Sequence, residues 1–138
     1  MTEEQTLVLI KPDGVARGLI GQIITRIEQR GYNIKQLQML TATSAQLQQH
    51  YADKLDKPYF PALVDYMTSG PLVAMVLEGT EVVQAFRSMA GTTNPIEALP
   101  GTIRGDLGRA WDSGAVQNIV HSSDSAAHAA TEIKIWFN

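Results

Sequence analysis

Apolar residues are spaced along this chain in two ways, and the spacing predicts an alternation of strands and helices. Short apolar runs at residues 6–10 and 72–77 predict buried strands, and a looser alternation over residues 32–43 predicts another. Apolar positions three and four residues apart within 19–30 predict an amphipathic helix that Gly31 closes. By the same criteria we expect helices at residues 44–54, 62–67, 80–89 and 126–132. Ser44 is the expected cap of 44–54, and Thr80 is the expected cap of 80–89.

The last third of the chain contains the most distinctive stretch. Residues 91–105 are rich in glycine, proline and threonine, and a connection of this length tends to be functional or disordered. A weak helical stretch follows at 107–111, and an apolar run at 116–120 predicts a strand that stops at His121.

His121 precedes four N-cap residues, Ser122 to Ser125, and an alanine-rich helix. Between a strand end and a helix start, backbone N–H groups and the helix dipole stabilise an anion, including a phosphate on the histidine itself. Considered alone, a histidine in such a turn more often only fills space. The rest of the chain therefore decides between the two interpretations.

The order of these elements predicts the fold class. Without the extra helices it is βαββαβ, the ferredoxin-like α+β plan, in which helices cover one face of a four-stranded antiparallel sheet. No internal repeat or shift in composition marks a second domain, so we expect residues 1–138 to form one domain. The aromatic residues close to Asn138 predict a docked C-terminal tail.

Composition excludes several classes of function. The net charge of -3 argues against a general nucleic-acid-binding protein, and the absence of cysteine removes disulfides, thiol catalysis and thiolate metal sites. The acidic, polar N-terminus does not resemble a signal peptide, and no apolar run approaches the ~20 residues that span a membrane. The sequence therefore predicts a soluble, cytoplasmic protein without a membrane association.

Several residues are candidates for chemistry, although each has an ordinary structural interpretation. Lys11 ends a buried strand, and its Lys11-Pro-Asp-Gly14 segment predicts a tight turn. Arg104 lies among glycines that allow close approach of a ligand, and Arg87 lies on the helix that leads into the same loop. Either arginine alone is more often a surface charge or part of a structural ion pair.

Other standard sites are absent from the sequence. It contains no P-loop, nucleophile elbow, zinc-protease or dinucleotide-binding motif. Its three histidines lack a metal-ligand pattern, and we interpret His50 and His128 as surface residues of helices.

Five short motifs in one order nevertheless resemble the nucleoside diphosphate kinase family over nearly the whole chain, from Thr6 to Phe137. They are Lys11-Pro-Asp-Gly-Val15 with Arg17-Gly-Leu, His50-Tyr51, Ser69-Gly-Pro71, Pro100-Gly-Thr-Ile-Arg-Gly-Asp106, and Asn118-x-x-His121-x-Ser-Asp-Ser125. Each motif is weak alone, but the five together in the family's order are specific. The resemblance implies the same ferredoxin-like fold.

The resemblance also implies a reaction, in which the γ-phosphoryl group of ATP passes to a nucleoside diphosphate by a ping-pong mechanism with Mg²⁺. His121 matches the family's phosphorylated nucleophile, and Glu132 and Ser123 match the pair that orients it. The metal is carried by the nucleotide phosphates, so no protein ligand to it is expected. The residues that match nucleotide-contacting positions are Lys11, Arg87 and Arg104 for the phosphates, Tyr51 and Thr93 for hydrogen bonds to them, Asn118 for the ribose, and Tyr59 for stacking on the base.

The chain departs from the family's pattern in a few places. Tyr59 replaces the usual phenylalanine, Ser122 replaces the commonest glycine, and the segment between Arg104 and His121 is a few residues longer. Val116 is the candidate for a second base contact. The resemblance implies a homo-oligomer, for which we favour a hexamer with residues 91–100 packed between subunits over a tetramer.

Two alternatives to the enzyme remain. One is an inactive nucleotide-binding or scaffolding module on the same fold, and the other is a ferredoxin-like regulator outside the family. An inactive relative is expected to lack at least one of His121, Lys11 and Arg104, and this chain retains all three. A regulator outside the family leaves the five ordered motifs unexplained. The sequence therefore favours an active nucleoside diphosphate kinase.

Overall fold

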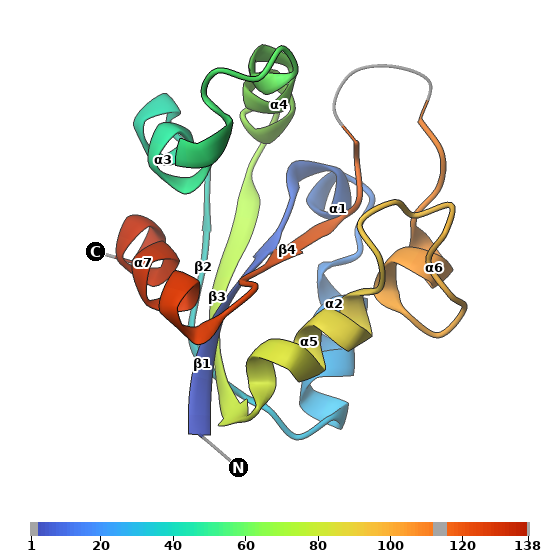
Figure 1. Cartoon of the computed structure of the whole chain (residues 1–138). Helices are drawn as coiled ribbons and strands as arrows, with labels where there is room; N and C mark the ends of the chain where they lie inside the picture. The colour runs from blue at the N-terminus through green and yellow to red at the C-terminus, as the bar shows by residue number, and fades with distance from the viewer. Residues whose placement is uncertain (1–2, 112–115, 138) are drawn as a thin grey trace.

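The computed structural model describes residues 3–111 and 116–137, and its centre is a four-stranded antiparallel sheet (Figure 1). The strand order is β2-β3-β1-β4, which is the order of the predicted ferredoxin-like plan and confirms the fold class. The strands are β1 (Glu3–Ile10), β2 (Asn33–Leu40), β3 (Leu72–Thr80) and β4 (Val120–Ser122).

Helices lie on both sides of this sheet, and Figure 1 shows α3 and α7 on one side of the strands and α2 and α5 on the other. The described helices are α1 (Pro12–Ala16), α2 (Ile20–Gln29), α3 (Ser44–His50), α4 (Phe60–Met67), α5 (Val82–Ala90), α6 (Ile103–Leu107) and α7 (Ala126–Trp136), with a short 3₁₀ turn at Ala52–Lys54. Among the described residues no helix combines the length and the apolar character needed to cross a membrane.

The expectation that helices cover one face of the sheet was wrong, because β1 buries side chains on both faces. Val8 and Ile10 pack with α2 and α5, whereas Leu7 and Leu9 pack with α3, α4 and α7. Side chains alternate between the faces of a strand, so a wholly apolar strand requires a cover on each side. The helices α2 and α5 of the basic plan share one face, and the additional helices cover the other.

The last strand is shorter and later than the sequence predicts. Residues 116–119 are not in a strand, and β4 begins at Val120, so His121 lies within the strand and not after it. Ile119 has a φ of 75°, which takes the backbone out of the extended conformation immediately before β4. His121 on the edge strand β4 pairs with Leu9 on the inner strand β1, and this pairing fixes the backbone of the candidate nucleophile.

Several helix boundaries also differ from the predictions. Thr43, not Ser44, caps α3, because Thr43 and Gln46 form a reciprocal capping box. Residue 80 belongs to β3, and α5 follows Glu81, which has a left-handed backbone and no side-chain cap bond. The predicted turn at 11–14 continues into α1, and α6 begins at Ile103, earlier than the predicted 107–111.

The helix α7 starts as predicted and runs four residues further. Of the four candidate caps, Ser125 accepts a hydrogen bond from the backbone N–H of His128 at 3.0 Å. The helix continues to Trp136, whose side chain is buried, and this confirms the docked tail. The extension matters for function because it places Glu132 and Trp136 one helical turn apart.

Candidate active site

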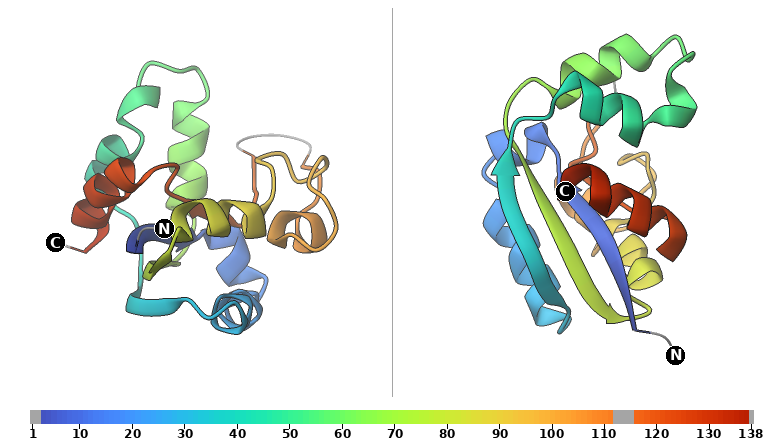
Figure 2. Two further views of the ribbon diagram at one scale, coloured as in Figure 1. Left: turned by 60° about the horizontal axis from the view of Figure 1, so that its bottom comes forward. Right: turned by 90° about the vertical axis from the view of Figure 1, so that its left-hand side faces the viewer.

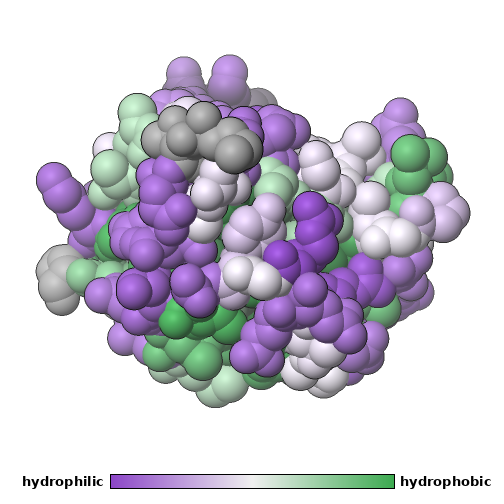
Figure 3. Space-filling model, turned by 90° about the horizontal axis from the view of Figure 1, so that it is seen from below, coloured by the Kyte–Doolittle hydropathy of each residue, from purple (hydrophilic) through white to green (hydrophobic). Residues whose placement is uncertain are grey.

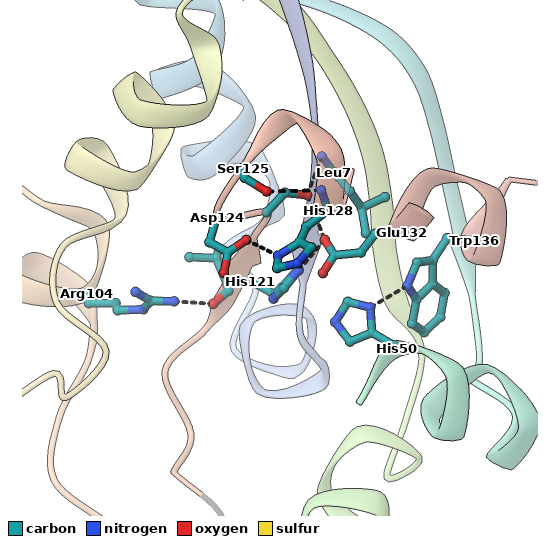
Figure 4. Close-up of polar contacts among 11 residues, drawn as sticks. Leu7, His50, Arg104, His121, Asp124, Ser125, His128, Glu132 and Trp136 are labelled. Atoms are coloured by element: carbon teal, nitrogen blue, oxygen red, sulfur yellow. Dashed lines mark hydrogen bonds and ion pairs between the residues drawn. The ribbon is translucent and has the colours of Figure 1, made fainter. Parts of the chain in front are cut away.

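His121 is fixed by a chain of hydrogen bonds that begins at the backbone of β1 (Figure 4). The N–H of Leu7 donates to Ser123 Oγ at 3.2 Å, and Ser123 Oγ donates to Glu132 Oε1 at 2.6 Å. The same carboxylate oxygen lies 3.0 Å from His121 Nε2. β4 supplies the histidine and α7 the carboxylate, so the sheet and the helix jointly orient the ring.

The carboxylate determines which nitrogen of His121 is reactive. Burial raises the pKa of Glu132, but the hydrogen bond and charge of His121 and the bond from Ser123 outweigh burial and leave that pKa below its ordinary value. An ionised carboxylate accepts a proton, so in the neutral ring Nε2 carries the hydrogen. The lone pair of His121 is then on Nδ1, and this nitrogen makes no hydrogen bond to another described residue.

His121 faces a cavity of about 850 Å³, large enough for a nucleotide. Most of the predicted site residues share its wall, although they come from opposite ends of the chain. The lining residues are Lys11, Tyr51, Gln84, Arg87, Ser88, Gly91, Thr92, Thr93, Leu99, Thr102, Arg104, Asn118, Val120, His121 and Ser122. Glu132 and Ser123 lie behind His121, outside this lining.

The cavity concentrates positive charge in a chain whose net charge is negative. Lys11 is only 8% exposed, and burial together with the nearby Arg104 lowers the pKa of Lys11 to about 8, against an opposing effect of Asp13. Burial, with a contribution from Arg87, lowers the pKa of Arg104 to about 10. Cations held this close in a partly buried wall are arranged for a multiply charged anion such as a polyphosphate.

Arg104 also connects the segments that form the cavity wall. Its guanidinium donates to three backbone carbonyls, at 2.8 Å to Gly91, 3.2 Å to Asn118 and 2.6 Å to Val120. These carbonyls belong to the end of α5, the segment before β4 and β4 itself. Because a guanidinium has five N–H groups, two remain after these bonds.

Asn118, the predicted ribose contact, is buried and has hydrogen-bond partners within the protein. It is 4% exposed, its Oδ1 accepts from Lys11 Nζ at 2.8 Å, and its Nδ2 donates to the carbonyl of Thr93 at 3.0 Å. Tyr51 is 8% exposed, and burial raises its pKa, so its hydroxyl keeps its proton and can donate into the cavity.

The two predicted base contacts lie outside the lining of the cavity that contains Lys11, Arg104 and His121. Tyr59 is 49% exposed and Val116 is 55% exposed, and neither belongs to the cavity lining. Part of the long segment before His121, residues 112–115, lies outside the described residues.

The interpretation of His50 as a surface residue was wrong, whereas His128 is exposed as expected. The His50 ring is centred 4.4 Å from the His121 ring and meets it at 73°, edge to face. A signal was present in the sequence, because His50 follows the buried Leu47 by three residues and so lies on the same helix face.

The structure also brings three side chains of metal-ligand type together, a cluster that the sequence did not reveal. Metal-binding atoms of His50, His121 and Glu132 all lie within 4.8 Å of one another. They are already engaged, since His121 binds Glu132 and His50 Nδ1 accepts from Trp136 Nε1 at 3.1 Å. Among the described residues that line the cavity there is no acid, so this wall suits an anion and not a free cation.

Comparisons with known proteins agree with this geometry. The family model described as nucleoside diphosphate kinase matches residues 4–138. The chain is 54% identical to a nucleoside diphosphate kinase of Streptococcus agalactiae, covering 98% of this chain and 99% of that protein, and 52% identical to one of Aspergillus fumigatus, covering 99% and 87%.

Two solved structures extend the likeness to ligand-bound proteins. A halophilic nucleoside diphosphate kinase from Halobacterium salinarum in complex with CDP has a TM-score of 0.92 and 40% identity, covering 99% of this chain and 89% of that one. A transition-state mimic of the Borrelia burgdorferi enzyme with bound vanadate and ADP has a TM-score of 0.90 and 33% identity, covering 99% and 88%.

Proposed function

This chain belongs to the nucleoside diphosphate kinase family, and from that premise we propose that Nδ1 of His121 carries the phosphoryl group between two nucleotides. The chain is a phosphotransferase that moves the γ-phosphoryl group of ATP to a nucleoside diphosphate through a phosphohistidine, in ping-pong order. The observation that carries the residue assignment is the bond of His121 Nε2 to Glu132, which leaves Nδ1 as the free nitrogen beside the cationic wall.

The two half-reactions use the same nitrogen in opposite directions. The lone pair of His121 Nδ1 attacks the γ-phosphorus of ATP, an N–P bond forms, the bond to the β–γ bridging oxygen breaks, and ADP leaves. A terminal phosphate oxygen of the incoming diphosphate then attacks the same phosphorus, and the N–P bond breaks. The ring is cationic while it is phosphorylated, and the Glu132 carboxylate at Nε2 stabilises that charge.

The cationic wall stabilises the charge that is transferred. Phosphoryl transfer depends mainly on positioning and electrostatic stabilisation, which Lys11, Arg87 and Arg104 supply at the phosphates. Tyr51 and Thr93 would donate hydrogen bonds to the phosphate oxygens. Charge and hydrogen bonds directed at phosphates carry no information about the base, which suits an enzyme that accepts several nucleotides.

We propose the sugar and base contacts from the exposure and hydrogen-bonding capacity of three residues. Asn118 Oδ1 has a second lone pair beside its bond to Lys11, and a ribose hydroxyl would donate to it. Tyr59 is exposed enough to stack on a base, and every base offers a π-face for that contact. Val116 is the proposed second base contact.

A nucleotide kinase generally requires a divalent metal, and we propose Mg²⁺. The part of the cavity lining that the structure describes is cationic and polar and contains no carboxylate, so the nucleotide's own phosphate oxygens would be the anionic ligands of the ion. The bound ion would neutralise part of the phosphate charge in the transition state.

We also propose a homo-oligomer, with a hexamer favoured over a tetramer. Leu37 and Met39 are 53% and 57% exposed on the edge strand β2, and Ile96 and Leu99 are 68% and 72% exposed on the loop after α5. Apolar patches interrupt an otherwise largely polar surface in Figure 3, and β2 forms the rim of the sheet in Figure 2. Exposed apolar groups on an open sheet edge favour association with a second copy.

Sedimentation of the purified chain tests this assembly. A species of six chains supports the hexamer, four chains support the alternative, and a monomer at micromolar concentration would overturn both. We further propose that residues 1–138 act as one domain and that the enzyme works in the cytoplasm, where its ATP donor is available.

The assignment of His121 is tested by incubation with ATP labelled at the γ-phosphate, without an acceptor. We expect acid-labile, base-stable label on the wild type and on His128→Ala, which removes an exposed histidine on α7. His121→Ala should carry no label, and the wild-type label should leave when a nucleoside diphosphate is added. Label retained by folded His121→Ala would overturn the assignment, and unlabelled wild type that still binds nucleotide would favour the inactive module.

A further inference from the structure

Two side chains on one face of α7 each form a hydrogen bond to a histidine ring. Glu132 accepts a hydrogen bond from His121 Nε2, and Trp136, four residues later, donates its indole N–H to His50 Nδ1 at 3.1 Å (Figure 4). Residues four apart on a helix lie on the same face. The two rings that they hold are in contact, with centroids 4.4 Å apart.

We propose that Trp136 is a positioning residue for the nucleophile: its indole N–H fixes the tautomer of His50, and in that tautomer His50 leaves Glu132 as the sole acceptor for His121 Nε2–H among the described residues. The inference rests on the proposed function, since it concerns the reactivity of His121. It adds a second layer to the site, because neither His50 nor Trp136 lines the nucleotide cavity.

The tautomer follows from the chemistry of the indole. An indole N–H only donates, so the Nδ1 of His50 that receives it must be unprotonated. Burial and the neighbouring His121 lower the pKa of His50 to about 3, and nearby Lys11 and Lys54 act in the same direction against Glu132. A neutral ring with a bare Nδ1 has its proton on Nε2, which in Figure 4 lies on the side of the ring away from Trp136.

This proton prevents a competing hydrogen bond. A ring nitrogen of His50 lies within 4.8 Å of both a nitrogen of His121 and an oxygen of Glu132. In the other tautomer, His50 Nε2 would carry no hydrogen and would be a hydrogen-bond acceptor close to His121 and Glu132. It would then compete with Glu132 for the hydrogen bond from His121 Nε2. The His121 ring would then divide between two partners, and its Nδ1 would be less often aligned with the phosphorus.

Rapid-mixing measurement of phosphoenzyme formation tests the proposal with three variants. Trp136→Phe removes the donor and keeps an aromatic ring, so we expect phosphorylation about fivefold slower, equivalent to about 1 kcal/mol. His50→Phe removes the competing acceptor and keeps a ring against His121, so its rate should stay close to wild type.

The double variant, His50→Phe with Trp136→Phe, decides between positioning and simple packing. We expect it to phosphorylate faster than Trp136→Phe alone, because no acceptor remains to compete with Glu132. Nucleotide affinity should be unchanged in all three. A double variant as slow as Trp136→Phe, or slower, would mean that the two residues act only through packing and would overturn the proposal.

The tautomer can be read in the wild type without any variant or any transfer. Long-range nitrogen–proton correlation spectra of the imidazoles should show His50 protonated on Nε2 and bare on Nδ1. A proton on Nδ1 would refute the inference even if Trp136→Phe failed to fold. Absence of label on the wild type would instead refute the proposed function, so the two failures are distinguishable.

Discussion

Replacing Glu132 by glutamine tests the central electrostatic element of the site with a minimal change in shape. The pKa of the wild-type carboxyl group lies below its ordinary value, so the group is ionised at neutral pH. Glutamine can keep an oxygen at the Oε1 position, where His121 Nε2 and Ser123 Oγ converge at 3.0 and 2.6 Å. The substitution then removes charge while it keeps both hydrogen bonds.

The magnitude follows from those bonds. A hydrogen bond to a charged group contributes about 1.5–3 kcal/mol, and one between neutral groups about 1 kcal/mol, so the variant loses about 0.5–2 kcal/mol at His121. This difference corresponds to a rate about 2- to 30-fold lower. The loss should fall on the phosphorylation step, because the ring gains positive charge there, and nucleotide affinity should not change because Glu132 lies outside the cavity lining.

The assay is single-turnover transfer of label from ATP to the protein, with nucleotide affinity measured separately on each variant. Glu28→Gln, an exposed acid on α2, is the matched control for the loss of one negative charge. A rate for Glu132→Gln within twofold of both the wild type and this control would refute the role assigned to the carboxylate. A weaker nucleotide affinity with an unchanged transfer rate would refute it as well.

Three further predictions concern the cavity wall and its support. Burial lowers the pKa of Lys11 to about 8, so this side chain should lose its proton and its attraction to phosphate as the pH rises through that value. The measured kcat/KM should therefore fall near pH 8, and the less active Lys11→Gln enzyme should lack this fall. Ser123→Ala leaves the buried Leu7 N–H without its side-chain acceptor and should lower the free energy of unfolding by about 1–3 kcal/mol in urea titrations, whereas an unchanged value would mean that this bond contributes nothing. Gly105→Ala would place a Cβ 1.9 Å from the backbone oxygen of Leu99, so we expect a lower melting temperature, and an unchanged one would contradict the packing of α6.

The sequence predicted the elements whose side chains follow a strict period. The apolar runs of β1 and β3 and the helical spacing of α2 were recognisable because their pattern is set by burial alone. β4 was misplaced because its start depends on the backbone of Ile119, which turns into the left-handed region despite an apolar side chain. Only the pairing with β1 defines that strand, and pairing is not visible in a single sequence.

The candidate site was predicted as a set of residues and not as a set of contacts. The motifs indicated Lys11, Arg104 and His121, and the structure brings them to one cavity. Sequence spacing could not show that Glu132 reaches His121, because that contact depends on the direction in which α7 crosses the sheet. His50 was missed for the same reason, since its partner Trp136 is 86 residues away.

Arg104 shows why binding and stability cannot be separated in this site. As a phosphate contact alone, Arg104 would be expected to keep the fold and to lose about 2 kcal/mol or more of phosphate stabilisation when it is replaced by alanine. Its three bonds to backbone carbonyls, however, join the loop after α5 to β4, and removing the guanidinium leaves all three acceptors without that donor. A residue that positions the wall through three of its five donors can present the other two to phosphate in a fixed direction. The rigidity that the chemistry requires therefore comes from the same side chain that supplies the charge.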